Sequence, residues 1–282
     1  MYSRGCFLNT EGRLILRATL PAWLEQALLF DRAAFQPLLL GQAQVGWLRP
    51  AFAARLAAWP QVFSPAGEGL AFSPLLADAA LRSQALATVL QVLRDEAMFP
   101  GWRDELYALH DAAGVELLRF ERAAAKHFGF IGPAAHLNGL VSLPEGLHMW
   151  IATRSASKAV EPGKLDNMVA GGIAAGMDGA SCLITECFEE AGIPAALARR
   201  ALPSGTLAFA RAVPQGVDAQ RIAVFDIELP AAFVPTNQDG EVAAFELLPV
   251  SAVLERLQVP HAFTVDAALV ALDCLRRRGL AP

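Results

Sequence analysis

The chain has 282 residues, of which 54% are hydrophobic and 18% are charged, with a formal net charge of -5. This composition supplies ample apolar side chains for a buried core and excludes a disordered chain. The acidic excess gives no basic surface of the kind that binds nucleic acid or an anionic membrane. No apolar run reaches the ~20 residues of a membrane-spanning helix. We therefore expect a soluble protein of one large or two modest domains.

The first 110 residues predict a small α+β unit. Spacing of apolar residues indicates two helices, over 22–29 and 75–96. Two short strands, over 45–48 and 61–63, lie between them and are bounded by turn signals. Ser73-Pro74 is a typical start for the second helix. No cluster of titratable residues in this unit suggests chemistry.

Residues 111–282 form the second predicted domain, in which strands dominate. Alternating or continuous apolar runs predict six strands, at 115–122, 136–141, 148–154, 206–213, 222–228 and 242–248. Two helices are expected, over 180–191 and 265–278. Three arginines followed by Gly279 suit the C-terminal end of the second helix.

The four cysteines, Cys6, Cys182, Cys187 and Cys274, form no CxxC pair. We expect free thiols buried as small apolar side chains, without a disulfide or metal role. The N-terminal residues lack the long apolar region of a secretory signal, so a cytoplasmic location is expected.

The informative segment begins with Gly171 and Gly172 and runs into the helix predicted over 180–191. Glu186, Glu189 and Glu190 stand at i, i+3 and i+4, which places three carboxylates on one side of that helix. Repulsion among them and with the C-terminal end of the helix dipole is costly unless cations neutralise it. Carboxylate oxygens in this pattern suit Mg²⁺ or Mn²⁺ better than Zn²⁺. A solvated acidic face is the alternative.

The spacing from Gly171 through the three glutamates to Gly192 resembles the Nudix box of the Nudix hydrolases. Two positions depart from that pattern. Met177 stands where the family has an earlier glutamate, and Thr185 where it has an arginine that helps to orient a catalytic glutamate.

Segments outside the box resemble one branch of the Nudix family, the branch of the Nudix domain that accompanies fungal thiamine pyrophosphokinase. Members of this branch carry an N-terminal domain of unknown function. The segments are 150–155, 165–172, 237–242 and 269–279. The resemblance implies an α/β fold, an α/β/α sandwich around a mixed sheet, for residues 111–282.

The resemblance also implies roles for the carboxylates. Glu186, Glu189 and Glu190, together with the Gly171 carbonyl, are expected to hold Mg²⁺ or Mn²⁺, and Glu186 and Glu189 to be catalytic. Glu241 is a second candidate for the general base. The alternative for Glu241 is an ordinary hairpin, because Asp239-Gly240 is a strong turn signal.

Substrate binding is expected from Arg154, Lys158, Asn167, Gly171 and Gly172. The alternatives are exposed surface cations for the first two and a turn-forming role for Asn167 with its neighbour Asp166. A structural role in the core fits His136, Asn138 and Trp150 better than a place in the pocket.

These observations predict a metal-dependent hydrolase of a diphosphate linked to another moiety. The resemblance favours thiamine diphosphate or a damaged, oxidised form, cleaved to the monophosphate. The alternatives are a nucleotide-sugar or dinucleotide pyrophosphohydrolase and a catalytically silent binding module. We expect a small-molecule diphosphate as the partner, with neither nucleic acid nor membrane, while a homodimer stays open. The N-terminal unit could shape the pocket, mediate dimerisation or cover apolar surface.

Overall fold

A mixed β-sheet forms the centre of the second domain in the computed structural model, which describes residues 20–281. Five strands lie in the order β11 (Leu202–Val213), β12 (Gly216–Glu228), β7 (Ile131–Leu143), β8 (Gly146–Arg154) and β13 (Val242–Pro249). Only β12 and β7 pair in parallel among these neighbours. Two short strands complete the sheet, β9 (Leu165–Asn167) on β8 and β10 (Val169–Gly172) on β7.

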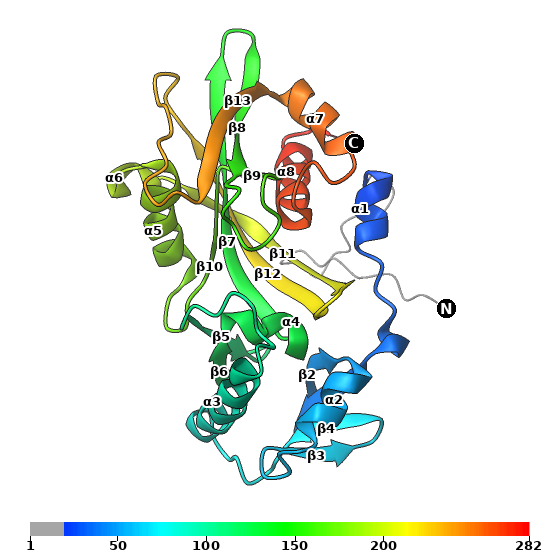
Figure 1. The fold of residues 1–282 in the computed structure, drawn as a ribbon. Coiled ribbons are helices and arrows are strands. Elements are labelled where there is room, and N and C mark those ends of the chain that lie inside the picture. The colour runs from blue at the N-terminus through cyan, green and yellow to red at the C-terminus, as the bar shows by residue number, and fades with distance from the viewer. Residues whose placement is uncertain (1–19, 282) are drawn as a thin grey trace.

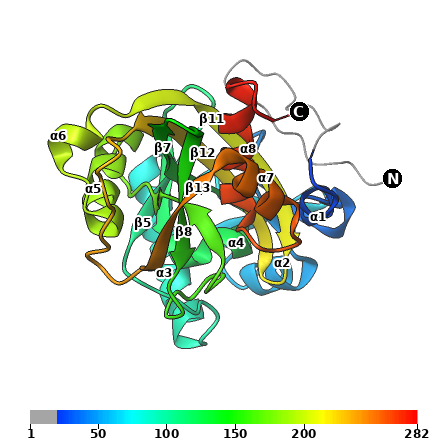
Figure 2. The same ribbon diagram turned by 90° about the horizontal axis from the view of Figure 1, so that it is seen from above.

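Helices cover both faces of this sheet (Figures 1 and 2). One face carries α5 (Gly179–Ala191) and α6 (Ala195–Ala198), and the other carries α7 (Val250–Gln258), α8 (Val265–Arg277) and α1 (Ala22–Ala27). Strand side chains alternate between the faces, so Ala135 and Leu137 pack under α5, and Ala134 and Leu140 under α8. The predicted α/β/α sandwich around a mixed sheet is confirmed.

The N-terminal unit has its own α+β core. A four-stranded sheet has the order β2 (Ala43–Leu48), β1 (Gln36–Leu40), β4 (Gly69–Phe72) and β3 (Phe63–Ala66). A hairpin and helices complete the unit: β5 (Leu106–His110), β6 (Glu116–Glu121), α2 (Pro50–Leu56), α3 (Ala79–Asp95), α4 (Ala125–Phe128), η2 (Arg32–Ala34) and η3 (Arg122–Ala124).

The core of this unit continues to Phe130, whose ring stacks on Phe128 with centroids 5.1 Å apart. The hairpin β5–β6 packs with that core, while α1 packs against the α8 side of the second domain. The division at residue 110 stays a prediction. It falls within the hairpin β5–β6, which packs as a whole with the N-terminal core.

The expected helix start at Ser73-Pro74 is wrong. Helix α3 begins at Ala79, because Asp78 caps it by accepting a hydrogen bond from the Leu81 amide at 2.8 Å. The short elements that were not expected from the sequence are α2, α4, α6, α7, β1, β4, β5, β9, β10, η2 and η3.

The three described cysteines, Cys182, Cys187 and Cys274, are buried free thiols, as expected. Cys6 and the N-terminal segment examined for a secretory signal lie outside the described residues. Within 20–281, no helix has the length and apolar character needed to cross a membrane.

Candidate active site

Helix α5 presents its three glutamates to different environments. Asp178 caps its N-terminus by accepting from the Ser181 amide at 2.8 Å, and Gly192 ends it with a φ of 64°. The apolar face packs into the core, which leaves Glu190 buried at 4% exposure, Glu186 half-buried and Glu189 exposed. The three carboxylates therefore span a gradient from core to solvent.

Strand β10 lies directly against the carboxylate side of α5. A Cβ added at Gly171 would overlap the carboxyl group of Glu186, and one added at Gly172 would overlap the hydroxyl of Tyr107. A side chain at Gly172 would have to displace the buried ring of Tyr107, whereas one at Gly171 would push aside the more flexible side chain of Glu186. The expected contacts of Gly171 and Gly172 with substrate remain a prediction.

Glu190 is anchored at the bottom of the site. Its Oε2 accepts a hydrogen bond from the Ala170 amide at 2.8 Å, and its Oε1 lies 3.7 Å from the ammonium of Lys158. Burial raises the pKa of Glu190 to about 8, against the lowering effects of the Ala170 amide and Lys158. Burial likewise raises the pKa of Glu186, and the charge of Glu189 adds to that shift.

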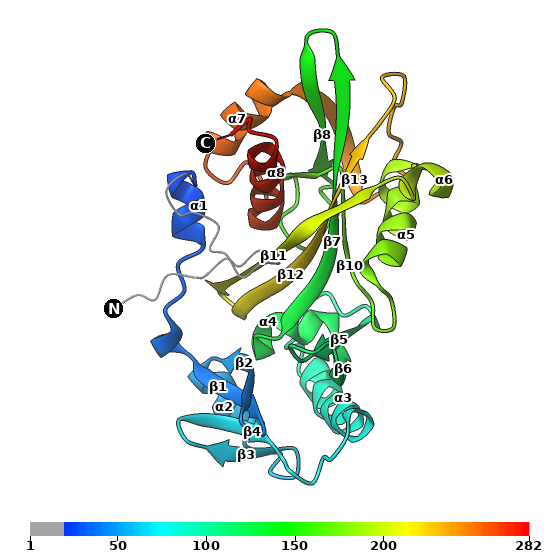
Figure 3. The same ribbon diagram turned by 180° about the vertical axis from the view of Figure 1, so that it is seen from behind.

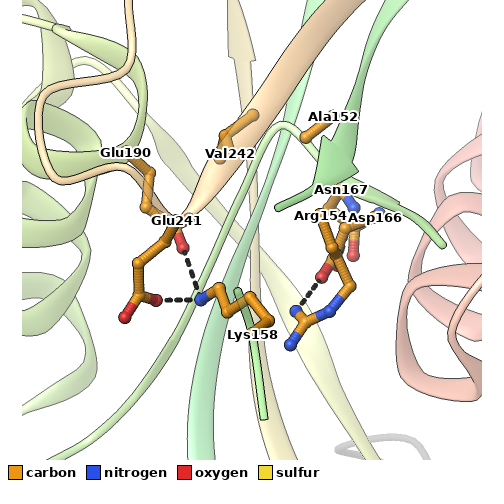
Figure 4. Close-up of a pocket in the computed structure, with 8 residues that line it drawn as sticks. All are labelled: Ala152, Arg154, Lys158, Asp166, Asn167, Glu190, Glu241 and Val242. Carbon is orange, nitrogen blue, oxygen red and sulfur yellow. Dashed lines mark hydrogen bonds and ion pairs between the residues drawn. The ribbon is translucent and has the colours of Figure 1, made fainter. Parts of the chain in front are cut away.

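Lys158 links two carboxylates from different elements (Figure 4). Its ammonium pairs with Glu190 of α5 and with Oε2 of Glu241 in the loop before β13. The side chain is only 10% exposed, so the alternative of an exposed surface cation is wrong. Burial lowers the pKa of Lys158, although Glu190 opposes that shift.

Arg154 lines the same pocket and is half-buried, with 15% of its side chain exposed, so it is not an exposed surface cation either. Its Nη1 donates to Asp166 at 2.6 Å, and its Nε and Nη2 donate to the Val160 carbonyl. Asp166 and Asn167 belong to β9 and not to a turn, so the turn-forming alternative is wrong.

Asn167 joins the pocket to the core behind it. Its Oδ1 contacts Nδ1 of His136 at 2.8 Å, and its Nδ2 donates to the Ala267 carbonyl at 3.3 Å. His136 and Asn138 are buried on the α8 side of the sheet, and Trp150 is buried under α5. The structural interpretation of these three residues agrees with their positions.

Glu241 does not lie in a β-hairpin, so that alternative is wrong. The loop 229–241 crosses from β12 to β13, which are separated in the sheet by β7 and β8. Amides of Thr236 and Gln238 donate to carbonyls of Ala191 and Glu189 at 3.0 and 2.9 Å, which fastens the loop to the end of α5. This connection brings Glu241 to Lys158.

The N-terminal unit contacts this site, in agreement with the expectation that it could shape the pocket. Arg103 Nη1 lies 3.3 Å from Oε1 of Glu241, so this carboxylate is held between Arg103 and Lys158. Glu186 of α5 also interacts electrostatically with three residues of the N-terminal unit, Glu105, Tyr107 and Arg122. No local motif could have revealed these residues, since Arg103 and Glu241 are 138 positions apart.

Comparison with known proteins decides the family. A family model described as a domain of unknown function, DUF4743, matches residues 22–131. Nudix hydrolase 24, chloroplastic, of Arabidopsis thaliana is 36% identical over 249 residues, which cover 87% of this chain and 68% of the relative. The chain belongs to the Nudix hydrolase family. Nudix hydrolase 20, chloroplastic, of the same plant is 34% identical over 255 residues, with the same coverage of both chains.

The chain is also similar to solved structures. DR0079 of Deinococcus radiodurans has a TM-score of 0.48 and 21% identity, covering 61% of this chain and 98% of its own. The NUDIX domain of NrtR from Shewanella oneidensis, solved with ADP ribose, has a TM-score of 0.43 and 12% identity over 54% and 92% of the two chains. The family assignment of this Nudix-type hydrolase rests on its sequence relatives.

The two departures from the Nudix box are both at the surface. Met177 is 43% exposed in the turn before α5. Thr185 is exposed, and its hydroxyl donates to the Ser181 carbonyl of its own helix at 3.3 Å. Because Thr185 carries no charge, the positive charge near Glu186 comes from Lys158 and Arg122.

The donor set of this Nudix site fits a hard divalent cation in its chemistry. The half-buried carboxylate of Glu186 lies against the Gly171 backbone, and Glu189 is exposed three residues further along α5. Burial raises the pKa of Glu186, and the nearby cations do not fully offset that shift. Residues 20–281 contain no group of three His, Cys, Asp or Glu side chains already gathered for a metal. Glu190 would join such a set only by parting from Lys158.

Proposed function

We propose that the chain is a metal-dependent hydrolase that cleaves a diphosphate linked to another moiety. The observation that carries this proposal is the meeting of Glu190 of α5 with Lys158 and Glu241 at one edge of the sheet. A diphosphate substrate and a divalent cation are the partners that such a mixed acidic and basic site accommodates.

The metal-binding residues would be Glu186, Glu189 and Glu190 with the Gly171 carbonyl, and the ion would be Mg²⁺ or Mn²⁺. When bound, such an ion neutralises phosphate oxygens and lowers the pKa of water. Glu189 faces solvent and needs no rearrangement to take part, whereas Glu190 must first release Lys158.

Glu186 and Glu241 are the proposed general bases. Glu241 is held by a cation at each oxygen, Arg103 at Oε1 and Lys158 at Oε2, so it must loosen one contact before it can accept a proton. Glu186 has no ion pair within the described part of the chain, and it rests against Gly171. The variant Glu241→Gln separates the two, because it leaves the proposed metal-binding residues intact and should lower kcat at every pH only if Glu241 is the base.

The substrate that we propose is thiamine diphosphate or an oxidised form of it, converted to the monophosphate. Support comes from the resemblance of segments 150–155, 165–172 and 237–242 to the thiamine-associated Nudix branch. Arg154, Lys158 and Asn167 line the pocket and would bind the substrate. Lys158 would bind the phosphate groups of the substrate by giving up its contact with Glu190 or Glu241 and pairing with a phosphate oxygen.

A silent binding module is the second candidate function. The observation that favours it is the ammonium of Lys158 between Glu190 and Glu241, where it competes with a metal ion for the same oxygens. Such a module would bind ligand without Mg²⁺ and release no product. A cytoplasmic location and a homodimer also remain proposals, and two of the relatives are named as chloroplastic.

The test is chromatographic analysis of phosphate products with Mg²⁺, using Glu189→Gln as the blank. The panel contains thiamine diphosphate, its oxidised analogues, ADP-ribose and other nucleoside diphosphate derivatives. Monophosphate from the thiamine set alone would establish the proposed substrate. Turnover of the nucleotide set alone would exclude the thiamine substrate but support diphosphate hydrolysis. The absence of product from every compound would favour the binding module.

A further inference from the structure

The hairpin β5–β6 of the N-terminal unit lies against the glycine-rich segment of the site (Figures 1 and 3). The Ala175 amide donates to the Leu106 carbonyl at 2.7 Å, which ties the loop before α5 to the start of β5. On the next residue of the hairpin, the Tyr107 hydroxyl fills the space that a side chain at Gly172 would need. The N-terminal unit therefore forms one wall beside the carboxylates of α5.

Two arginines of this wall are held by a shared buried residue. Glu121 is 2% exposed, and its Oε1 accepts hydrogen bonds from the amides of Arg103 and Ala123, both at 3.3 Å. This fixes the backbone at Arg103 and just after Arg122. The side chains of Arg103 and Arg122 are 43% and 40% exposed, respectively.

Each arginine is directed toward acidic groups of the site. Arg103 pairs with Glu241, as described above. Arg122 Nη1 lies 2.8 Å from Oε2 of Glu105, its guanidinium is 5.7 Å from the centre of the Tyr107 ring, and it interacts electrostatically with Glu186. Both are thus placed where an anionic substrate would approach the α5 carboxylates.

The charge balance of the site requires such cations. Glu186, Glu189, Glu190 and Glu241 repel a diphosphate, and helix α5 carries no Lys or Arg over its 13 residues. Arginine binds phosphate through two parallel hydrogen bonds, and it keeps its charge when partly buried. Accessible arginines opposite the carboxylates can exchange a carboxylate partner for phosphate oxygens.

We propose that the N-terminal unit supplies the phosphate-binding wall of the active site, with Arg103 and Arg122 binding the oxygens of the substrate diphosphate. This inference rests on the proposed diphosphate hydrolase function. It assigns the N-terminal unit a direct role in substrate binding, beyond covering apolar surface.

The experiment measures binding of methylenediphosphonate, a diphosphate analogue that cannot be hydrolysed, to the full chain by calorimetry, with Mg²⁺ and again with EDTA. Arg122→Gln and Glu105→Gln form a matched pair, because both break the same ion pair but only the first removes a cation. We expect Arg122→Gln to weaken binding about tenfold and Glu105→Gln to leave it unchanged or tighter. Equal weakening by both variants would show a structural role and overturn the inference.

Arg103→Gln should also weaken binding about tenfold, and Arg119→Gln serves as the control. Arg119 lies on β6 of the same unit and pairs with Glu116 at 2.8 Å, outside the proposed site. Thermal unfolding checks that each variant folds. If Arg122→Gln does not fold, Arg122→Lys replaces it, because lysine keeps the charge but cannot form the two parallel hydrogen bonds. Binding like wild type in both the Arg103 and Arg122 variants would overturn the inference.

Kinetics separate this inference from the proposed function. With a hydrolysed diphosphate, the arginine variants should raise KM about tenfold and change kcat much less. If the wild type binds the analogue through the arginines but hydrolyses nothing, the proposed function fails and the inference stands. If the wild type hydrolyses a diphosphate but the arginine variants bind the analogue and the substrate as the wild type does, the inference fails and the proposed function stands. No binding of the analogue by wild type overturns the inference.

Discussion

Two buried carboxylates on opposite faces of the central sheet differ in how completely they are paired. On the α8 face, Asp226 is 6% exposed and accepts hydrogen bonds from Arg277 at 2.7 and 3.2 Å and from Asn138 at 2.9 Å. On the α5 face, Glu190 is 4% exposed, but it has one amide donor and a lysine that it shares with Glu241.

The pKa values of the two groups differ accordingly. Burial acts on both, but the donors of Asp226 outweigh it and lower the pKa of that carboxyl, whereas burial dominates at Glu190 and raises its pKa to about 8. A fully paired carboxylate stabilises the fold, and one with incomplete pairing is available to bind a cation or a substrate. We expect variants on the α5 face to change activity and variants on the α8 face to change stability.

The largest expected effect on activity is that of Glu189→Gln. Glu189 is exposed, so the substitution should leave the fold intact, while the loss of one metal-binding carboxylate should lower kcat by about a thousandfold. Steady-state kinetics with Mg²⁺ and thermal unfolding of the same sample measure both quantities. Near-normal turnover would contradict the assignment of the metal site.

The matching change on the α8 face is Asp226→Ala. It leaves Arg277 without its main partner and Asn138 without an acceptor, and we expect a loss of about 3 kcal/mol in the free energy of unfolding. Urea denaturation measures this loss, with Asp273→Ala as a control that removes only the more exposed second partner of Arg277. Equal losses of unfolding free energy in the two variants would show that the buried position of Asp226 adds nothing to its contribution to stability.

Asp226 should also make stability depend on pH. Burial alone would raise the pKa of its carboxyl, but the hydrogen bonds from Arg277 and Asn138 bring it below the ordinary value of 3.8. A lowered folded-state pKa gives stability that is present above about pH 4 and is lost as the pH falls through the folded value. The advantage of wild type over Asp226→Asn in urea denaturation should therefore shrink below about pH 4, and a constant difference would exclude this role.

A smaller effect is expected from Lys158→Met. Removal of the ammonium frees Glu190 and Glu241, so Mn²⁺ should bind severalfold more tightly, while KM for the substrate rises because a phosphate-binding cation is lost. Electron paramagnetic resonance of free Mn²⁺ measures the first change. Lys164→Met, which removes a pair with Glu161, is the control from the same loop. Weaker Mn²⁺ binding in the Lys158 variant would contradict competition between lysine and metal.

The smallest effect is expected from Thr185→Arg. Thr185 is exposed and bonds only its own helix, so the free energy of unfolding should change by less than about 0.5 kcal/mol. An added positive charge near Glu186 should leave the rate unchanged or raise it. A collapse of activity in a folded variant would show that Thr185 is adapted to a rearranged site.

Local sequence signals predicted the long elements well. The helix expected over 180–191 is α5 within one residue, and the six strands expected after residue 110 are present as β6, β7, β8, β11, β12 and β13. Short elements escaped, because β9 and β10 have three and four residues and are defined by pairing with β8 and β7. Their apolar patterns are too short to show a period.

The sequence by itself determined the helix with three glutamates, the glycines beside it and the family, because these depend on spacing within about 25 neighbouring residues. Tertiary structure alone decided that Glu190 is buried, that Glu241 meets Lys158, and that Arg103 reaches Glu241 across 138 positions. Contacts of this kind depend on how separate elements pack, and the resulting desolvation and pairing set the charge state of each group.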